Sequence, residues 1–174
     1  MNYFELYGLP VSFNVDTAAL RNVYLQNSKK FHPDFHTLAG DAEQAEMLER
    51  STLNNEAYKT LSDADRRIRY VLEIKGLLGS EESQPPLPQA FLMEMMDLNE
   101  SLMELEFDFD PARYEAALRA VGEIERTLER DMTPVLQTWK ESDGAEPLLR
   151  VRDYFLKKRY LLRIRENLSK FAPQ

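Results

Sequence analysis

The sequence contains no cysteine among its 174 residues. This absence excludes disulfides, thiolate nucleophiles and metal sites with cysteine ligands, and it agrees with a reducing compartment. The sequence also has no uninterrupted apolar run of about 18 residues, and no basic and then apolar leader opens it. We therefore expect a cytoplasmic protein that does not bind a membrane.

Basic residues are outnumbered, with 22 lysines and arginines against 30 acidic residues and a net charge of −8. Binding to nucleic acid through bulk charge is not expected, because phosphate backbones attract clustered positive charge. The segment from Gly76 to Ala112 has nine acids and no lysine or arginine, whereas Val151 to Lys170 is strongly basic. We expect the basic segment to pair with the acidic one through Lys157, Lys158, Arg159, Arg163 and Arg165.

Catalytic motifs are also missing. No glycine-rich loop that could cradle a phosphate is present, so the chain should not hydrolyse a nucleotide. The neighbouring carboxylates of Asp108 and Asp110 are better explained as a turn and a helix N-cap than as a general acid and base. We predict a protein that is not an enzyme and that carries no cofactor.

Helical periodicity covers nearly the whole chain, and no alternating strand pattern competes with it, so the predicted fold class is all-α. The second helix should end at about Phe31, because Pro33 disfavours helical backbone at His32. The third helix should turn Leu48, Leu53, Ala57, Tyr58 and Leu61 toward a neighbouring helix. Capping residues predict where the four N-terminal helices begin, namely at Asn2 with Glu5, Asp16, Asp41 with Gln44, and Ser62 with Asp65.

One linker-like stretch, from Gly79 to Pro88, is rich in proline and polar residues. It divides the chain into an N-terminal domain (1–78), a linker (79–87) and a C-terminal domain (88–174). Pro134 should kink or interrupt the second C-terminal helix. Three helical patterns with short connections predict an antiparallel three-helix bundle, with helices at about Gln89–Glu106, from Pro111 onward, and Pro147–Phe171.

The tripeptide His32-Pro33-Asp34 follows the second helix directly, so its side chains should be presented at the start of a loop. Imidazole donates and accepts hydrogen bonds, and a carboxylate accepts them from an arginine fork. The simplest alternative is that His32 and Asp34 only cap a helix end. A zinc site using His32 and His36 is a further alternative, although Pro33 breaks the helix between them.

This region resembles a J-domain, the module with which co-chaperones stimulate the ATPase of a DnaK-type chaperone. His32, Pro33 and Asp34 match the family's signature, and Phe35 and Asn54 depart from its usual residues. The resemblance implies a helical hairpin whose chaperone-binding residues are His32, Pro33, Asp34, Lys29, Lys30 and Arg21. Other matching residues are Phe4, Glu5, Leu6 and Gly8, Tyr24, and Asn55, Glu56, Ala57, Tyr58, Leu61, Ser62 and Asp63.

The first C-terminal helix is too apolar for a single buried stripe. One side, with Phe91, Met95, Leu98, Leu102 and Leu105, has the spacing expected of a core. Leu92, Met96 and Met103 fall on roughly the opposite side, and Met93, Asp97, Glu100 and Glu104 border them. An apolar strip with adaptable methionines and an acidic rim is typical of a protein interface. Burial of this strip in a homodimer or against the first domain is the alternative.

The whole chain resembles the HscB-type iron–sulfur co-chaperones, and Phe91-Leu92-Met93-Glu94 matches a characteristic block of that family. The resemblance implies a C-terminal domain that holds an IscU-like scaffold, on which clusters are built, and a J-domain that engages an HscA-like chaperone. We expect a monomer, and the implied scaffold-binding residues are Leu92, Met93, Met96, Asp97, Glu100, Met103, Glu104 and Phe155. The alternatives are a general J-domain adaptor with another client and a histidine-based metal-binding protein.

Overall fold

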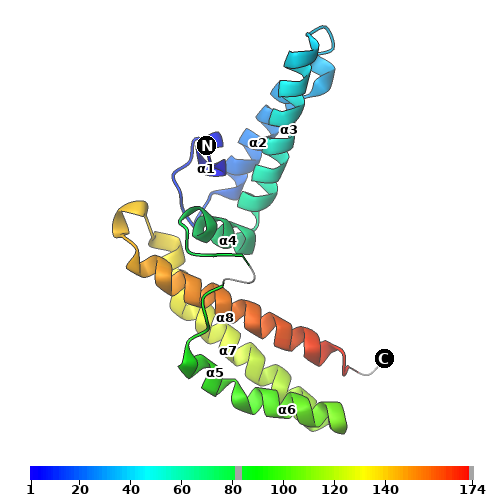
Figure 1. The fold of residues 1–174 in the computed structure, drawn as a ribbon, viewed down its shortest axis with the longest axis vertical. Coiled ribbons are helices and arrows are strands. Elements are labelled where there is room, and N and C mark those ends of the chain that lie inside the picture. Colours follow the sequence, from blue (N-terminus) through cyan, green and yellow to red (C-terminus); the bar gives the residue numbers. More distant parts are fainter. Residues whose placement is uncertain (81–83, 173–174) are drawn as a thin grey trace. The chain divides into compact units, whose positions relative to one another are not determined.

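The computed structural model describes residues 1–80 and 84–172, and within these ranges every regular element is a helix (Figure 1). The chain forms two compact units. The first comprises Met1–Gly76 together with Trp139–Ser142, and the second comprises Leu77–Thr138 and Asp143–Gln174. Of the predicted linker, residues 81–83 lie outside the described residues, and the boundary at 79–87 stays a prediction.

The first unit is built around a hairpin of two antiparallel helices, α2 (Thr17–Phe31) and α3 (Asp41–Ser62), which lie side by side in Figure 1. The rings of Tyr24 and Tyr58 stack between them with centroids 4.2 Å apart. The predicted capping box of Asn2 and Glu5 and the N-cap at Asp16 are confirmed, as is the end of α2 at Phe31. The elements are α1 (Tyr3–Leu6), α2 (Thr17–Phe31), the 3-10 helix η1 (Pro33–Phe35), α3 (Asp41–Ser62) and α4 (Ala64–Ile74).

Two predicted helix starts and part of one predicted face are wrong. Helix α3 is preceded by Gly40 without a side-chain cap, and α4 is capped by Asp63, which accepts a hydrogen bond from the Arg66 backbone. Leu48 and Leu53 of α3 are exposed rather than packed against a neighbouring helix. They lie off the buried side of this helix, which contains Asn54, Ala57 and Leu61 and the partly buried Met47 and Ser51.

A buried polar group joins three elements of the first unit. Asn54 is 1% exposed, and its Nδ2 donates to the Tyr24 carbonyl oxygen at 3.2 Å and to Ser28 Oγ at 3.3 Å. The Tyr7 hydroxyl donates to Asn54 Oδ1 at 2.7 Å. Because a buried polar group is costly unless it is hydrogen-bonded, this network makes asparagine suitable at a position inside the core.

Replacing Tyr7 with phenylalanine should lower the free energy of unfolding by about 1–2 kcal/mol at pH 7, because Asn54 Oδ1 loses its short hydrogen bond. Burial also raises the pKa of Tyr7. Above pH of about 10, tyrosine in the unfolded chain ionises while Tyr7 in the folded chain stays protonated, so wild-type stability should fall as pH rises. The variant should show a smaller alkaline fall in urea titrations between pH 7 and 10.5. Equal alkaline slopes for both proteins would contradict this account.

A buried arginine fastens the loop that follows α1. Arg67 of α4 donates from Nε to the Phe13 carbonyl oxygen at 2.8 Å and from Nη1 to the Leu61 carbonyl oxygen at 2.6 Å. Burial lowers the pKa of Arg67. Trp139 also belongs to this unit, and its ring packs against Phe13 with centroids 5.1 Å apart.

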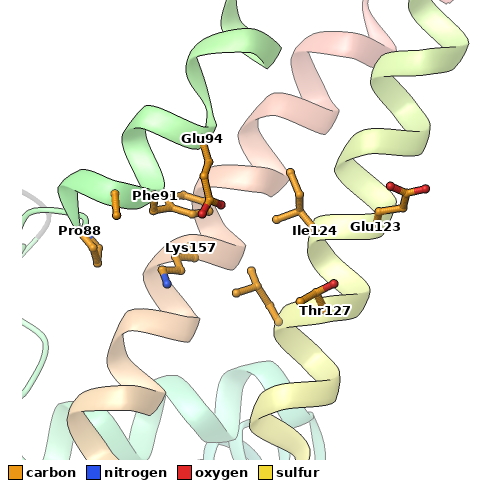
Figure 2. A pocket seen from close by; sticks show the side chains of 9 residues that line it. Pro88, Phe91, Glu94, Glu123, Ile124, Thr127 and Lys157 are labelled. Carbon is orange, nitrogen blue, oxygen red and sulfur yellow. The ribbon is translucent and has the colours of Figure 1, made fainter.

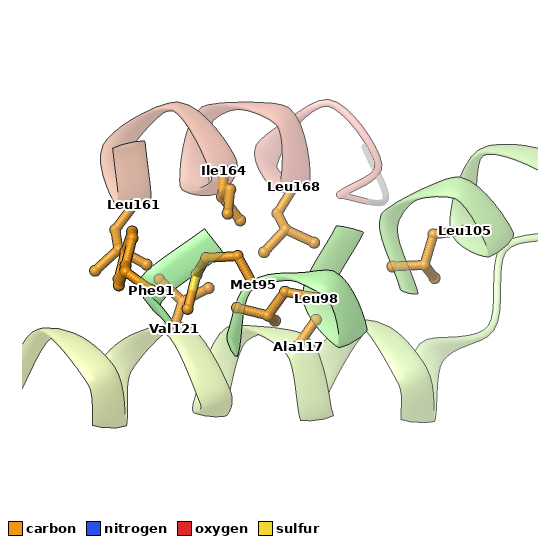
Figure 3. Packing of buried hydrophobic residues seen from close by; sticks show 9 residues of the cluster. All are labelled: Phe91, Met95, Leu98, Leu105, Ala117, Val121, Leu161, Ile164 and Leu168. Atoms are coloured by element: carbon orange, nitrogen blue, oxygen red, sulfur yellow. The ribbon is translucent and has the colours of Figure 1, made fainter. Parts of the chain in front are cut away.

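The second unit is an antiparallel helical bundle. The predicted core face is confirmed, since Phe91, Met95, Leu98 and Leu105 are buried and Leu102 is partly buried against them. Figure 3 shows the four buried side chains packed with Ala117, Val121, Leu161, Ile164 and Leu168. The helices are α5 (Gln89–Glu94), α6 (Met96–Phe107), α7 (Pro111–Thr138) and α8 (Glu146–Ser169), and the 3-10 helix η3 (Glu141–Asp143) precedes α8.

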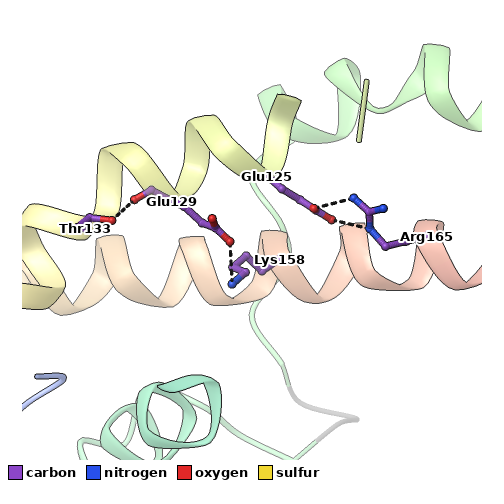
Figure 4. A network of polar contacts seen from close by, with 5 residues as sticks. All are labelled: Glu125, Glu129, Thr133, Lys158 and Arg165. Carbon is purple, nitrogen blue, oxygen red and sulfur yellow. Dashed lines mark hydrogen bonds and ion pairs between the residues drawn. The ribbon is translucent and has the colours of Figure 1, made fainter. Parts of the chain in front are cut away.

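Two features of the bundle differ from the prediction. Helix α7 runs through Pro134 to Thr138, so the predicted interruption is wrong, while the predicted kink stays a prediction. The ion pairs shown for α8 run to α7 rather than to the acidic first helix (Figure 4), and Lys157 lies over the Phe91 ring of that first helix. Arg165 makes two hydrogen bonds to Glu125, at 2.8 and 3.2 Å, and Lys158 Nζ lies 3.5 Å from a carboxylate oxygen of Glu129.

Candidate functional site: a loop motif and a helix surface

The His32-Pro33-Asp34 motif lies at the exit of α2, as predicted. His32 has extended backbone geometry (φ −63°, ψ 131°), which ends the helix, and Pro33 begins the single turn η1. The side chains of His32 and Asp34 are 52% and 85% exposed. Both polar side chains are therefore accessible to a partner.

The histidine and the aspartate hold each other in place. His32 Nδ1 accepts a hydrogen bond from the Asp34 backbone N–H at 3.2 Å, and it lies 3.6 Å from Asp34 Oδ2. An Nδ1 that accepts a backbone hydrogen bond carries no proton in the neutral ring, so the proton is on Nε2. The exposed ring can then donate through Nε2 while the Asp34 carboxylate accepts.

Two side chains fix the loop that follows. His36 Nε2 lies 2.8 Å from the Lys30 carbonyl oxygen, a distance for a hydrogen bond to the last turn of α2. Gln44 Nε2 lies within 3.2 Å of the carbonyl oxygens of His36, Thr37 and Ala39. Gln44 therefore stabilises the loop instead of completing a capping box with Asp41, and this role depends on the tertiary path of the loop.

The proposed zinc site gains no support from this geometry. His36 Nε2 is engaged by the Lys30 carbonyl oxygen, so only its Nδ1 could bind a metal. Across the described ranges, histidine, aspartate and glutamate side chains form no group of three or more that could hold a metal ion.

The predicted basic residues do not all lie near the motif. Lys29 and Lys30 are exposed on the last turn of α2, directly before His32. Arg21 is exposed near the other end of the helix, about 16 Å away along its axis. Phe35 is an additional exposed side chain, and its ring meets the His32 ring edge-on with centroids 6.2 Å apart.

The second candidate surface lies on α5 and α6, and we call it the strip. Its apolar members, which are 41 to 66% exposed, are Leu92, Met93, Met96 and Met103. Asp97, Glu100 and Glu104 are exposed beside them. Met95 is fully buried at the junction of the two helices, where the backbone remains in the right-handed helical region. One face of α5 and α6 therefore packs in the core while the other is left without cover.

Comparison with known proteins shows which family this chain belongs to. Residues 87–169 match the model of the HSCB C-terminal oligomerisation domain. A co-chaperone protein HscB homolog of Vibrio cholerae is 36% identical over 79% of this chain and 78% of its own length. The chain belongs to the HscB co-chaperone family. An HscB homolog of Aeromonas hydrophila is 32% identical over 98% of this chain and 96% of its own.

Solved HscB structures have the same fold. Chaperone HscB from Vibrio cholerae has a TM-score of 0.65 and 27% identity, covering 98% of this chain and 96% of its own. The human co-chaperone HscB has a TM-score of 0.71 and 28% identity, covering 98% of this chain and 81% of its own. The all-α prediction of a J-domain and a C-terminal helical bundle is thereby confirmed. Membership supports a role as an iron–sulfur cluster co-chaperone.

Within this HscB-family chain, Phe155 differs from the other predicted scaffold-binding residues. It is 9% exposed, so little of its ring is available to a partner. It precedes the core residue Ile164 by nine positions, which is about half a rotation around α8. On an ideal helix its side chain would point away from that core, so its place in the scaffold-binding surface stays a prediction.

The structure also shows one contact that periodicity could not reveal. Glu104, an acid at the rim of the strip, pairs with Arg113 of α7 at 2.8 Å. Its charge is therefore partly compensated within the unit, whereas Asp97 and Glu100 have no ion pair in the described part of the chain.

Among residues 1–80 and 84–172, we find no helix with the length and hydrophobicity that crossing a bilayer requires.

Proposed function

We propose that this chain binds an IscU-like iron–sulfur scaffold through the strip and stimulates the ATPase of an HscA-like, DnaK-type chaperone through His32, Pro33 and Asp34. It acts as a monomer in the cytoplasm and performs no catalysis itself. The observation that carries the proposal is the two-sided character of α5 and α6. Their core face is complete with Phe91, Met95 and Leu98, so Leu92, Met96 and Met103 are not needed for packing within the unit.

The proposed mechanism combines tethering with a shift in the chaperone's conformational equilibrium. Holding the scaffold on the strip raises its local concentration near the chaperone that the J-domain engages. The motif presents a donor and an acceptor from one rigid turn, and it stimulates hydrolysis only if it binds the hydrolysing state more tightly than the resting state. Lys29 and Lys30 flank the motif and favour an acidic surface on the chaperone.

Self-association is a second candidate for the strip. An exposed apolar surface is also what a homodimer covers, and the matching family model is described as an oligomerisation domain. The acidic rim argues against it, because two copies of a surface bordered by Asp97, Glu100 and Glu104 would repel each other.

The proposal is tested by reconstituting the three proteins. An HscA-like chaperone should hydrolyse ATP faster with this chain than alone, and the scaffold and this chain together should stimulate more than either one does. Analytical ultracentrifugation of the chain alone then tests self-association. The scaffold function is wrong if calorimetry detects no binding to the scaffold. A general adaptor is favoured instead if the chain stimulates the chaperone but copurifies with another client.

A further inference from the structure

An open groove of about 500 Å³ lies between α5 and α7, with α8 at its base (Figure 2). The side chains of Ile124 and Leu128 supply its accessible apolar surface, whereas Phe91 also lines it but is only 4% exposed. Glu94 lines it from α5 and Glu123 lines it from α7. In Figure 2 the Glu94 side chain extends down from its helix to the level of Phe91.

The groove carries two carboxylates that form no ion pair with the described residues of their own unit. Neither Glu94 nor Glu123 makes an ion pair or hydrogen bond with any described residue. The one basic side chain in the lining, Lys157, is placed over the Phe91 ring at 5.5 Å. Two carboxylates above an apolar surface suit a side chain with an aliphatic stem and a cationic end.

The groove is continuous with the strip. Ala90 and Glu94 line the groove, and they precede Met93 and Asp97 of the strip by three positions each. Residues three apart on a helix are surface neighbours, and the helical backbone at Met95 keeps this spacing from α5 into α6. A partner lying on the strip therefore reaches the groove without crossing another element.

We propose that the groove receives one lysine or arginine side chain of the scaffold that covers the strip, so this inference rests on the proposed function. The stem would pack on Ile124 and Leu128, and the cation would lie beside Glu94, while Glu123 adds negative charge at the α7 rim of the groove. A purely apolar side chain fits less well, since it would remove water from Glu94 without offering a hydrogen bond. The scaffold surface that binds this chain is then both apolar and basic.

Calorimetric titration with an IscU-like scaffold tests the proposal on the full chain. At low salt, the double variant Glu94→Gln/Glu123→Gln should bind about fivefold more weakly than wild type, because exposed ion pairs contribute modestly. Added salt should weaken wild type more than the variant, so the two affinities should converge. The matched double variant Glu115→Gln/Glu166→Gln removes two exposed acids outside the groove and should bind like wild type.

A second variant tests whether the open volume of the groove is needed for binding, independently of its carboxylates. Thr127 is an exposed residue in the lining, and Thr127→Trp should fill the groove and weaken binding about tenfold at every salt concentration. Thermal melts should show that all these variants are folded. If Met96→Ala weakens binding while the groove variants bind like wild type, the groove proposal is overturned and the strip function stands. If wild type does not bind the scaffold, both are overturned.

Discussion

Replacing His32 with glutamine should reduce the ATPase rate of the DnaK-type chaperone to its basal value. The ring is exposed, its Nδ1 is oriented by the Asp34 backbone, and its Nε2 is left to donate to a partner. Glutamine keeps a donor but loses the fixed position of the ring, so the motif can no longer favour the hydrolysing state. The measurement is single-turnover ATP hydrolysis with the full chain in excess.

The loss should be specific to function. His32 packs in no core, so the thermal midpoint and helical circular dichroism should stay close to wild type, within about half a kcal/mol of unfolding free energy. Asp34→Asn should impair stimulation as well, whereas Glu49→Gln, an exposed change on α3, should not. Unimpaired stimulation by the His32 variant would remove the basis for assigning this motif to the chaperone.

Truncations on the two faces of α5 and α6 should separate stability from binding. Leu98→Ala removes a buried side chain and should lower the free energy of unfolding by about 2–5 kcal/mol. Leu92→Ala, Met96→Ala and Met103→Ala remove exposed side chains and should change stability by about half a kcal/mol or less. Denaturant titrations of the four variants measure this difference directly.

Scaffold affinity should show the reverse order. Truncating a central apolar side chain of an interface weakens binding by about 1–2 kcal/mol or more, so Leu92→Ala and Met96→Ala should have clear effects in calorimetry. Glu100→Lys should weaken association most at low salt, because it reverses a rim charge. Unchanged affinity in both apolar variants would mean that the strip is not the scaffold-binding element. A loss of stability equal to that of Leu98→Ala would mean that these side chains are buried.

Much of the local structure follows from neighbouring residues. Asp16 caps α2 because its carboxylate reaches the backbone N–H groups of Ala18 and Ala19, and Pro33 ends the helix through its own ring. The two faces of the first C-terminal helix follow from a period of 3.6 residues, and the structure has Leu98 inside and Met96 outside. These predictions depend on contacts within one or two helical turns.

The sequence predicted less well which helices would lie next to each other. The basic charge of α8 predicted pairing with an acidic helix, but Arg165 meets Glu125 of α7, because Coulomb attraction does not specify which acidic helix lies nearest. The sequence predicts that Leu48 and Leu53 face a neighbouring helix, but they lie off the buried side of α3 and remain exposed. That buried side runs through Met47, Ser51, Asn54 and Leu61.

The sequence by itself determined the helices, the exposed position of His32-Pro33-Asp34 and the apolar excess of the first C-terminal helix, because caps, proline geometry and periodicity are local properties. The tertiary structure decided what surrounds each face. It made Asn54 the buried partner of Tyr7, used Gln44 to fix the loop after the motif, buried Phe155, and opened a groove beside Glu94. Apart from the Gln44 contacts, which reach residues five to eight positions away, these features depend on segments far apart in the chain, whose packing no local pattern encodes.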